Sequence, residues 1–196
     1  MQNVSYDKII EYIQSEQQYI YKNCYKEALN KVLLLSESEV LELVDKYTVN
    51  QPNYRDERHF VMNYIDALLM ETEGFTWSFS QYGWVIQNEM FEVTKISLEN
   101  KNSLQIGKSP NNRFFFGYSI NLGGSGGASG LCLYGDSFKS FDEAKQGGLN
   151  YVKERYLQCA LNFSEDTTNF NRKIVADLKK AIEFYLPPVG SQLRLF

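Results

Sequence analysis

GFTWSFSQYGWVIQNEMFEVTKISL, residues 74–98, is the stretch that decides the fold. From Gly74 onward, aromatic and β-branched residues alternate with polar ones, which is typical of strands that bury one face. Three later runs are also rich in β-forming residues and are bounded by Gly, Asn or Pro. They are SLQIG at 103–107, RFFFGYSINL at 113–122 and LCLYG at 131–135. Together these runs predict an antiparallel sheet of four or five strands.

The residues before Gly74 follow a helical period instead. Apolar residues such as Ile9 and Ile13 recur at three-to-four spacing, which indicates amphipathic helices. Ser36 and Glu39 have the spacing of a capping box that opens a helix running through Tyr47. A further helix is expected over about 55–70, so residues 1–73 are predicted to form an N-terminal helical layer.

Two helices are expected after the sheet. The first opens at the capping box Ser140–Glu143, and the second runs from about Asn169 to Tyr185, where Pro187 and Pro188 end it. The predicted class is therefore α+β, with two C-terminal helices packed on the sheet. The expected divisions are a helical region at 1–73, a sheet with helices at 74–186, and a peptide tail at 187–196.

The composition is that of a globular protein, with 43% hydrophobic and 22% charged residues. No apolar run approaches the roughly 20 residues needed to span a bilayer, and no secretory leader is recognisable. The cysteines Cys24, Cys132 and Cys159 are odd in number and lie far apart, so we expect reduced thiols. These features predict a cytoplasmic protein without membrane contact, metal or cofactor.

Charge is unevenly distributed along the chain. The net charge is −4, which argues against a surface that grips nucleic acid all over. Residues 1–73 carry 13 acidic and 7 basic side chains, a net −6, whereas residues 74–196 carry 11 and 13, a net +2. Any contact with nucleic acid is therefore expected in the second part.

The glycine-rich stretch at 123–130 invites comparison with a phosphate-binding loop, because glycines let backbone N–H groups approach an anion. No GK[ST] follows it, and it lies between two predicted strands rather than before a helix. We expect a long, flexible hairpin tip there. Whether this tip binds a partner is not decided by the sequence.

No catalytic centre is recognisable. His59 is the only histidine and sits at a charged helix start, so a surface position is expected. Asp136, Asp142 and Glu143 with Lys145 superficially match the acidic set of a metal-dependent nuclease. In such nucleases the E-x-K lies on a strand, whereas Glu143 here is better explained by the capping box. The chain is therefore interpreted as a non-enzyme, with the nuclease kept as an alternative.

An aromatic run offers a different kind of site. The sequence contains 13 Phe, 14 Tyr and 2 Trp, a content that favours interaction surfaces. Phe115 and Tyr118, with the cations Lys108 and Arg113 nearby, are candidate contacts for nucleic acid or a protein, because rings on a sheet can stack bases. Alternation places Phe114 and Phe116 on one face and Phe115 on the other, so one set is core.

The last five residues carry the most specific signal. Gln192-Leu193-Arg194-Leu195-Phe196 resembles the bacterial sliding-clamp-binding motif, usually written Q-L-S/D-L-F, and departs from it only at Arg194. The resemblance implies that Leu193, Leu195 and Phe196 enter a hydrophobic groove of the clamp while Gln192 supplies hydrogen bonds. The alternative is that Leu195 and Phe196 pack on the protein's own surface.

The middle of the chain, from Gly117-Tyr118 through the glycine stretch to the helix opening at Ser140, is weakly similar to small β-sheet-plus-helix domains of phage, plasmid and integrative-element proteins. These resemblances imply a non-enzymatic accessory protein of a bacterial mobile element or phage, recruited to the replication machinery by its tail. One alternative is an inhibitor that binds a host protein, and the other is the nuclease. Oligomeric state and the target of the body stay open.

Overall fold

The computed structural model describes residues 4–16, 23–48, 56–133, 135–162 and 171–186. It confirms the α+β class, with six helices and two antiparallel sheets among these residues. The chain divides into two compact units, 1–90 and 91–196. The expected division at residue 74 thus differs from the observed one, since the first hairpin after Gly74 packs with the helices.

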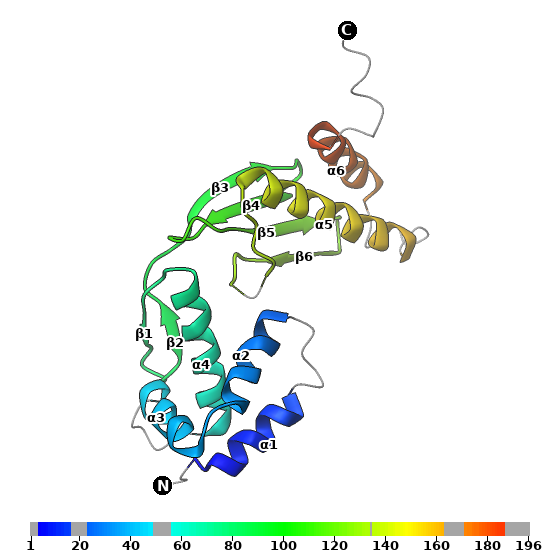
Figure 1. Ribbon diagram of the computed structural model, residues 1–196. Coiled ribbons are helices and arrows are strands. Elements are labelled where there is room, and N and C mark those ends of the chain that lie inside the picture. Colours follow the sequence, from blue (N-terminus) through cyan, green and yellow to red (C-terminus); the bar gives the residue numbers. More distant parts are fainter. Residues whose placement is uncertain (1–3, 17–22, 49–55, 134, 163–170, 187–196) are drawn as a thin grey trace. The chain divides into compact units, whose positions relative to one another are not determined.

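The first unit contains four helices and one short hairpin (Figure 1). The elements are α1 (Tyr6–Glu16), α2 (Asn23–Leu33), α3 (Glu37–Tyr47), α4 (Glu57–Thr72), β1 (Trp77–Phe79) and β2 (Val85–Gln87). Helix α4 is central, because it contacts α1, α2, α3 and β2. The fully buried side chains around it are Ile9, Ile13, Leu29, Val32, Val40, Phe60, Val61 and Ile65.

Helix starts in this unit follow the expected capping chemistry. Ser36 and Glu39 form the predicted capping box, in which each side chain accepts the other's backbone N–H. Helix α4 begins after Asp56, whose carboxylate accepts the N–H of His59 at 2.7 Å. Both caps satisfy donors that an α-helix leaves unpaired at its start.

The second unit is a four-stranded meander with two helices on one face (Figure 1). Strands β3 (Glu92–Ser97), β4 (Ser103–Lys108), β5 (Phe114–Asn121) and β6 (Gly126–Ser129) pair in sequence order, and α5 (Phe141–Asn162) and α6 (Arg172–Tyr185) follow. The predicted pair of C-terminal helices is confirmed. Their core with the sheet comprises Leu98, Leu104, Ile106, Ile120, Leu122, Ala144, Leu149, Val152, Tyr156, Leu178 and Ile182.

One strand was assigned to the wrong residues. The run LCLYG at 131–135 is not a strand where it is described, and β6 is built from the glycine stretch instead. The expected long hairpin tip shrinks to a tight turn, in which Leu122 N–H donates to the Ser125 carbonyl at 2.8 Å. Periodicity could not reveal this strand, because glycines carry no hydrophobic pattern.

The opposite face of the sheet is covered by the chain itself around Gly107 and Gly117, whereas Val93 on β3 is exposed there. A Cβ on Gly117 would lie 2.8–2.9 Å from backbone atoms of Ser129, Gly130 and Leu131, and a Cβ on Gly107 would lie 2.6 Å from a methyl of Leu131. The two glycines therefore leave the space into which residues 129–131 pack. This close backbone approach explains why the segment after β6 turns beneath β5 instead of extending as a strand.

Candidate functional site

The tail that carries the clamp-binding resemblance follows the last described helix. Helix α6 ends at Tyr185, and the N–H of Leu186 donates to the carbonyl of Ile182 at 2.7 Å. Gln192, Leu193, Leu195 and Phe196 lie outside the described residues. The part of the candidate site that can be described is therefore the surface of α6 and its neighbours, which precede this tail in the chain.

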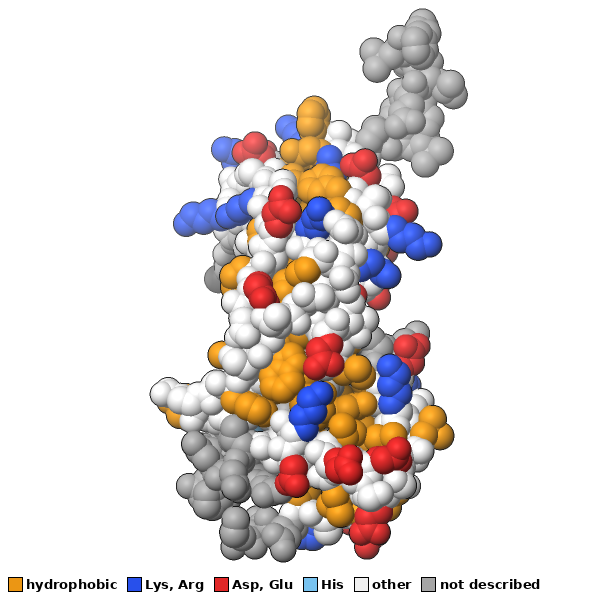
Figure 2. Space-filling model, turned by 60° about the vertical axis from the view of Figure 1, so that its left-hand side comes forward, with side chains coloured by type: hydrophobic (Ala, Val, Ile, Leu, Met, Phe, Trp, Pro, Cys, Tyr) orange, Lys and Arg blue, Asp and Glu red, His pale blue; other side chains and the backbone are white. Residues whose placement is uncertain are grey.

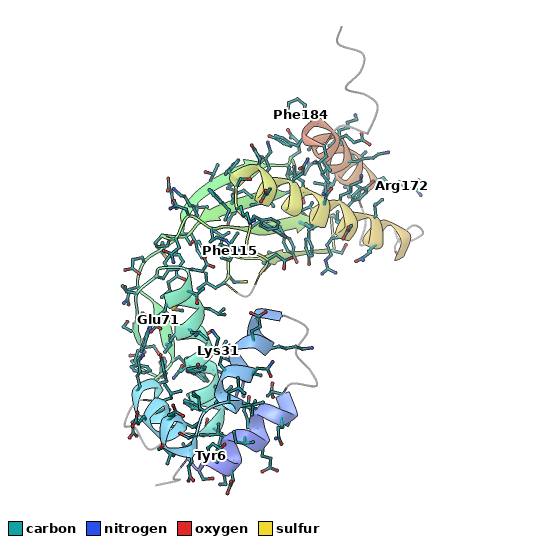
Figure 3. The ribbon with its side chains drawn as sticks, viewed as in Figure 1. Tyr6, Lys31, Glu71, Phe115, Arg172 and Phe184 are labelled. Carbon is teal, nitrogen blue, oxygen red and sulfur yellow. The ribbon has the colours of Figure 1, made fainter. Side chains whose placement is uncertain are left out.

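The sheet does not bring the aromatic contact candidates Phe115 and Tyr118 together on one face. Phe115, labelled in Figure 3, is only 2% exposed. Its ring contacts that of Phe91 edge-on at a centroid distance of 5.5 Å. Tyr118 lies on the other face, where its hydroxyl is 3.3 Å from that of Tyr151 on α5. Because strand residues alternate, Phe115 and Tyr118 cannot face one ligand. This corrects the expectation that both belong to one contact surface.

The two candidate cations, Lys108 and Arg113, lie at the end of β4 and directly before β5. Arg113 donates to the carbonyl of Ser137 at 3.5 Å and contacts its hydroxyl, so its guanidinium anchors the segment before α5. Lys108 is half-buried at the end of β4, opposite Phe114 in the ladder. Arg113 thus has a structural role that the sequence pattern did not indicate.

The hydroxyl pair of Tyr118 and Tyr151 has an electrostatic consequence. The hydrogen bond to Tyr118, together with burial, raises the pKa of the Tyr151 phenol. Arg155 lies 6.0 Å from the Tyr151 ring centroid. A raised pKa keeps the Tyr151 phenol neutral, so it can donate a hydrogen bond but is not activated as a base.

His59 is not on the surface as expected. Its side chain is buried, and its ring stacks on Trp84 with a centroid distance of 4.0 Å. Its Nδ1 lies 3.0 Å from the Asp56 carboxylate that caps α4. The histidine therefore joins the helix start to the β1–β2 hairpin, a packing role that the charged neighbouring sequence concealed.

The acidic residues of the nuclease alternative do not converge on a metal-binding arrangement in the described part of the chain, where no group of three or more His, Cys, Asp or Glu side chains could hold an ion. Asp142 and Glu143 occupy the first turn of α5. Glu143 accepts the N–H of Lys139 at 3.1 Å, and its own N–H donates to Ser140 at 3.2 Å. The predicted capping box is thus observed in part: Ser140 caps the helix start, but the Glu143 carboxylate accepts the N–H of Lys139 rather than that of Ser140.

A surface that the sequence pattern did not reveal lies on α6. Phe184 is 80% exposed and projects from the helix (Figure 3). It borders a shallow hollow between α6 and the β3–β4 turn. The hollow is lined by Glu99, Lys173, Asp177, Lys180, Ala181, Phe184 and Tyr185. The sequence signal for this surface was an apolar Phe184 among lysines on the polar face of the helix. Together with the open hollow beside it, this side chain offers a place for contact with another molecule.

A second hollow adjoins the first through Tyr185. Lys145 on α5 holds its Nζ 4.7 Å from the centroid of the Tyr185 ring, a cation–π contact. The lining residues are Asp142, Lys145, Gln146, Leu149, Tyr185 and Leu186. Both hollows are open; the first runs along α6 from Lys173 to Tyr185, and the second lies at the C-terminal end of the helix. Such surfaces suit docking of a protein better than enclosure of a small substrate.

No protein-family description, no curated protein and no solved structure matches the chain. Among the described residues, every helix is too short or too polar to cross a membrane. Cys132 is a half-buried free thiol, while the side chains of Cys24 and Cys159 lie outside the described part.

Proposed function

We propose that this chain is a non-enzymatic accessory protein of a bacterial mobile element or phage, recruited to the replication machinery by binding of its tail to the sliding clamp. The observation that carries the proposal is the pentapeptide Gln192–Phe196, which matches the clamp-binding pattern at four of its five positions. A short peptide binds this way because a few apolar anchors supply most of the free energy of binding.

The body of the protein supports a binding role. The tail follows α6, whose polar face carries the exposed Phe184 and an open hollow. The carboxylate of Glu143 is engaged at a helix start, which weakens the nuclease alternative. The body would then deliver or hold a second partner at the clamp.

An inhibitor that binds a host protein is the second candidate, and the charge of the first unit favours it. Residues 1–90 carry 14 acidic and 7 basic side chains, a net −7. Figure 2 shows carboxylates spread among hydrophobic side chains on this unit. An acidic surface of this kind is complementary to a basic protein partner rather than to DNA.

The experiment is titration of purified bacterial sliding clamp with the intact chain, measured by calorimetry. We expect a dissociation constant in the micromolar range or tighter, and loss of binding when residues 192–196 are removed. Substitution of Leu195→Ala or Phe196→Ala should weaken binding by about tenfold or more, since each removes a buried anchor. Arg194→Ser is the matched control, because it restores a residue usual in the motif and should preserve affinity.

A synthetic peptide of residues 187–196 should compete with the intact chain for the clamp. Absence of binding by the intact chain would reject the clamp proposal and leave the host-protein inhibitor as the leading function. Incubation of the protein with plasmid DNA and Mg²⁺ or Mn²⁺ tests the nuclease alternative separately, and cleavage that Glu143→Gln abolishes would support it.

A further inference from the structure

Helix α6 carries a stripe of four residues, Lys173, Asp177, Lys180 and Phe184, that faces away from the core. Their spacing of four, three and four residues places them on one side of the helix. The buried residues Leu178 and Ile182 occupy the side that joins the core shared with α5 and the sheet. Lys173, Lys180 and Phe184 are exposed and Asp177 is half-exposed, so the stripe is accessible in the described structure.

Among the described residues, the lysines of the stripe make fewer ion pairs than the lysine on the other flank of α6. On that flank Lys179 pairs with Glu183 at 3.7 Å. Neither Lys173 nor Lys180 makes an ion pair within the part of the chain that the structure describes. Asp177 accepts one hydrogen bond, from Asn100 at 3.1 Å, and a carboxylate has capacity for further donors.

The order of charges along the stripe is self-complementary for antiparallel helices only. If two copies of α6 pair about a twofold axis between positions 178 and 179, Asp177 of one copy faces Lys180 of the other. The same axis sets Lys173 opposite Phe184, a cation over a ring. Each contact occurs twice because the interface is isologous. In a parallel pairing, Lys180 would face Lys180 and the charges would repel.

We infer that the α6 stripe is a self-association surface, and that its partner is the same stripe of a second copy of this chain in antiparallel orientation. Ala181, beside the stripe in the hollow, is small enough to let the helices approach. Contacts from residue 173 to residue 184 span about 16 Å of helix, which makes a small interface. Association is therefore weak, with half-dimerisation expected at about 10–500 µM protein.

The test is sedimentation equilibrium of the full chain over that concentration range. Lys180→Glu places two acidic residues opposite each other, and Asp177→Lys places two lysines opposite each other, so each change should weaken dimerisation by about tenfold or more. The double variant Asp177→Lys with Lys180→Glu exchanges the charges and should restore the original dissociation constant to within about threefold. Lys179→Glu, on the opposite flank, is the matched control and should leave dimerisation unchanged.

Mixing the two charge variants distinguishes loss of the dimer interface from loss of folding. The Lys180→Glu protein presents two carboxylates at 177 and 180, and the Asp177→Lys protein presents two ammonium groups there. The mixture should therefore form heterodimers more tightly than either protein forms homodimers. Circular dichroism of each variant checks that both are folded. Removal of residues 192–196 should not change dimerisation, which keeps this inference independent of clamp binding. A monomer at every concentration, no recovery by charge exchange, or loss of dimers without the tail would each overturn it.

Discussion

The side-chain carboxamide of Asn63, fully buried in α4, accepts the backbone N–H of Val85 in β2 at 2.8 Å. Its amide nitrogen donates to the carbonyl of Gly83 at 2.8 Å and to that of Tyr47 at 3.0 Å. One side chain thus satisfies three backbone groups and joins α4 to α3 and to the hairpin. The hairpin, too short for stability by itself, is held by this residue.

Asn63→Ala should lower the free energy of unfolding of the first unit by about 2–4 kcal/mol, because three buried backbone groups lose their partner. Urea denaturation followed by tryptophan fluorescence measures this, since both tryptophans lie in the hairpin. The exposed Asn150→Ala is the control and should change stability by less than about 0.5 kcal/mol. Equal effects of the two substitutions would show that Asn63 is not a linking residue.

Gly117 and Gly127 form a matched pair in the second unit. A Cβ on Gly117 would press on backbone atoms at 2.8–2.9 Å, whereas a Cβ on Gly127 would meet nothing within 4 Å. Gly117→Ala should therefore destabilise the unit by about 1–3 kcal/mol through overpacking. Gly127→Ala should be neutral or slightly stabilising. Thermal unfolding by circular dichroism compares them, and similar melting temperatures would contradict the packing of residues 129–131 beneath β5.

Asp66 on α4 makes stability depend on pH. Burial raises the pKa of its carboxyl to about 6, above the value of about 3.9 in an unfolded chain. Its contribution to stability is therefore full below about pH 4 and is lost as the pH rises through 6. Asp66→Asn should raise the free energy of unfolding at pH 7.5 by about 1–3 kcal/mol and have little effect at pH 4.

Urea titrations of this variant between pH 4 and 8 measure the effect, with Glu42→Gln on the exposed side of α3 as control. If wild type and Asp66→Asn lose stability in parallel across this range, the carboxyl of Asp66 does not titrate near pH 6.

Ser36 tests the helix-capping chemistry of the first unit. Its hydroxyl accepts the N–H of Glu39 at 3.4 Å and donates to the Glu39 carboxylate at 2.6 Å. Ser36→Ala should cost about 1 kcal/mol of stability, and Ser36→Asp should retain most of it because aspartate also caps helices. Equal loss in both variants, measured by urea denaturation, would assign the effect to something other than the cap.

The helices and most strands were predictable because their signals are local. The capping box at Ser36 and the cap at Ser140 each act within one turn of helix. The β3–β4 and β4–β5 turns contain residues that tolerate the left-handed conformation, as Asn100 and Asn112 do with φ of 47° and 58°. Strand β6 was missed because a strand of glycine, alanine and serine pairs by its backbone alone. Its partner β5 decides that it is a strand.

The candidate sites also differ in whether their signal is local in the sequence or depends on tertiary contacts. The clamp-binding resemblance is linear, so Gln192–Phe196 is recognisable without any structure. The separation of Phe115 from Tyr118 follows from strand alternation alone. The burial of His59 against Trp84 and the stripe on α6 depend instead on which faces of helices and strands are covered. By itself the sequence determined the α+β class, the helix starts and the tail motif. Only tertiary packing decided which side chains are accessible, because burial depends on contacts between residues distant in the chain.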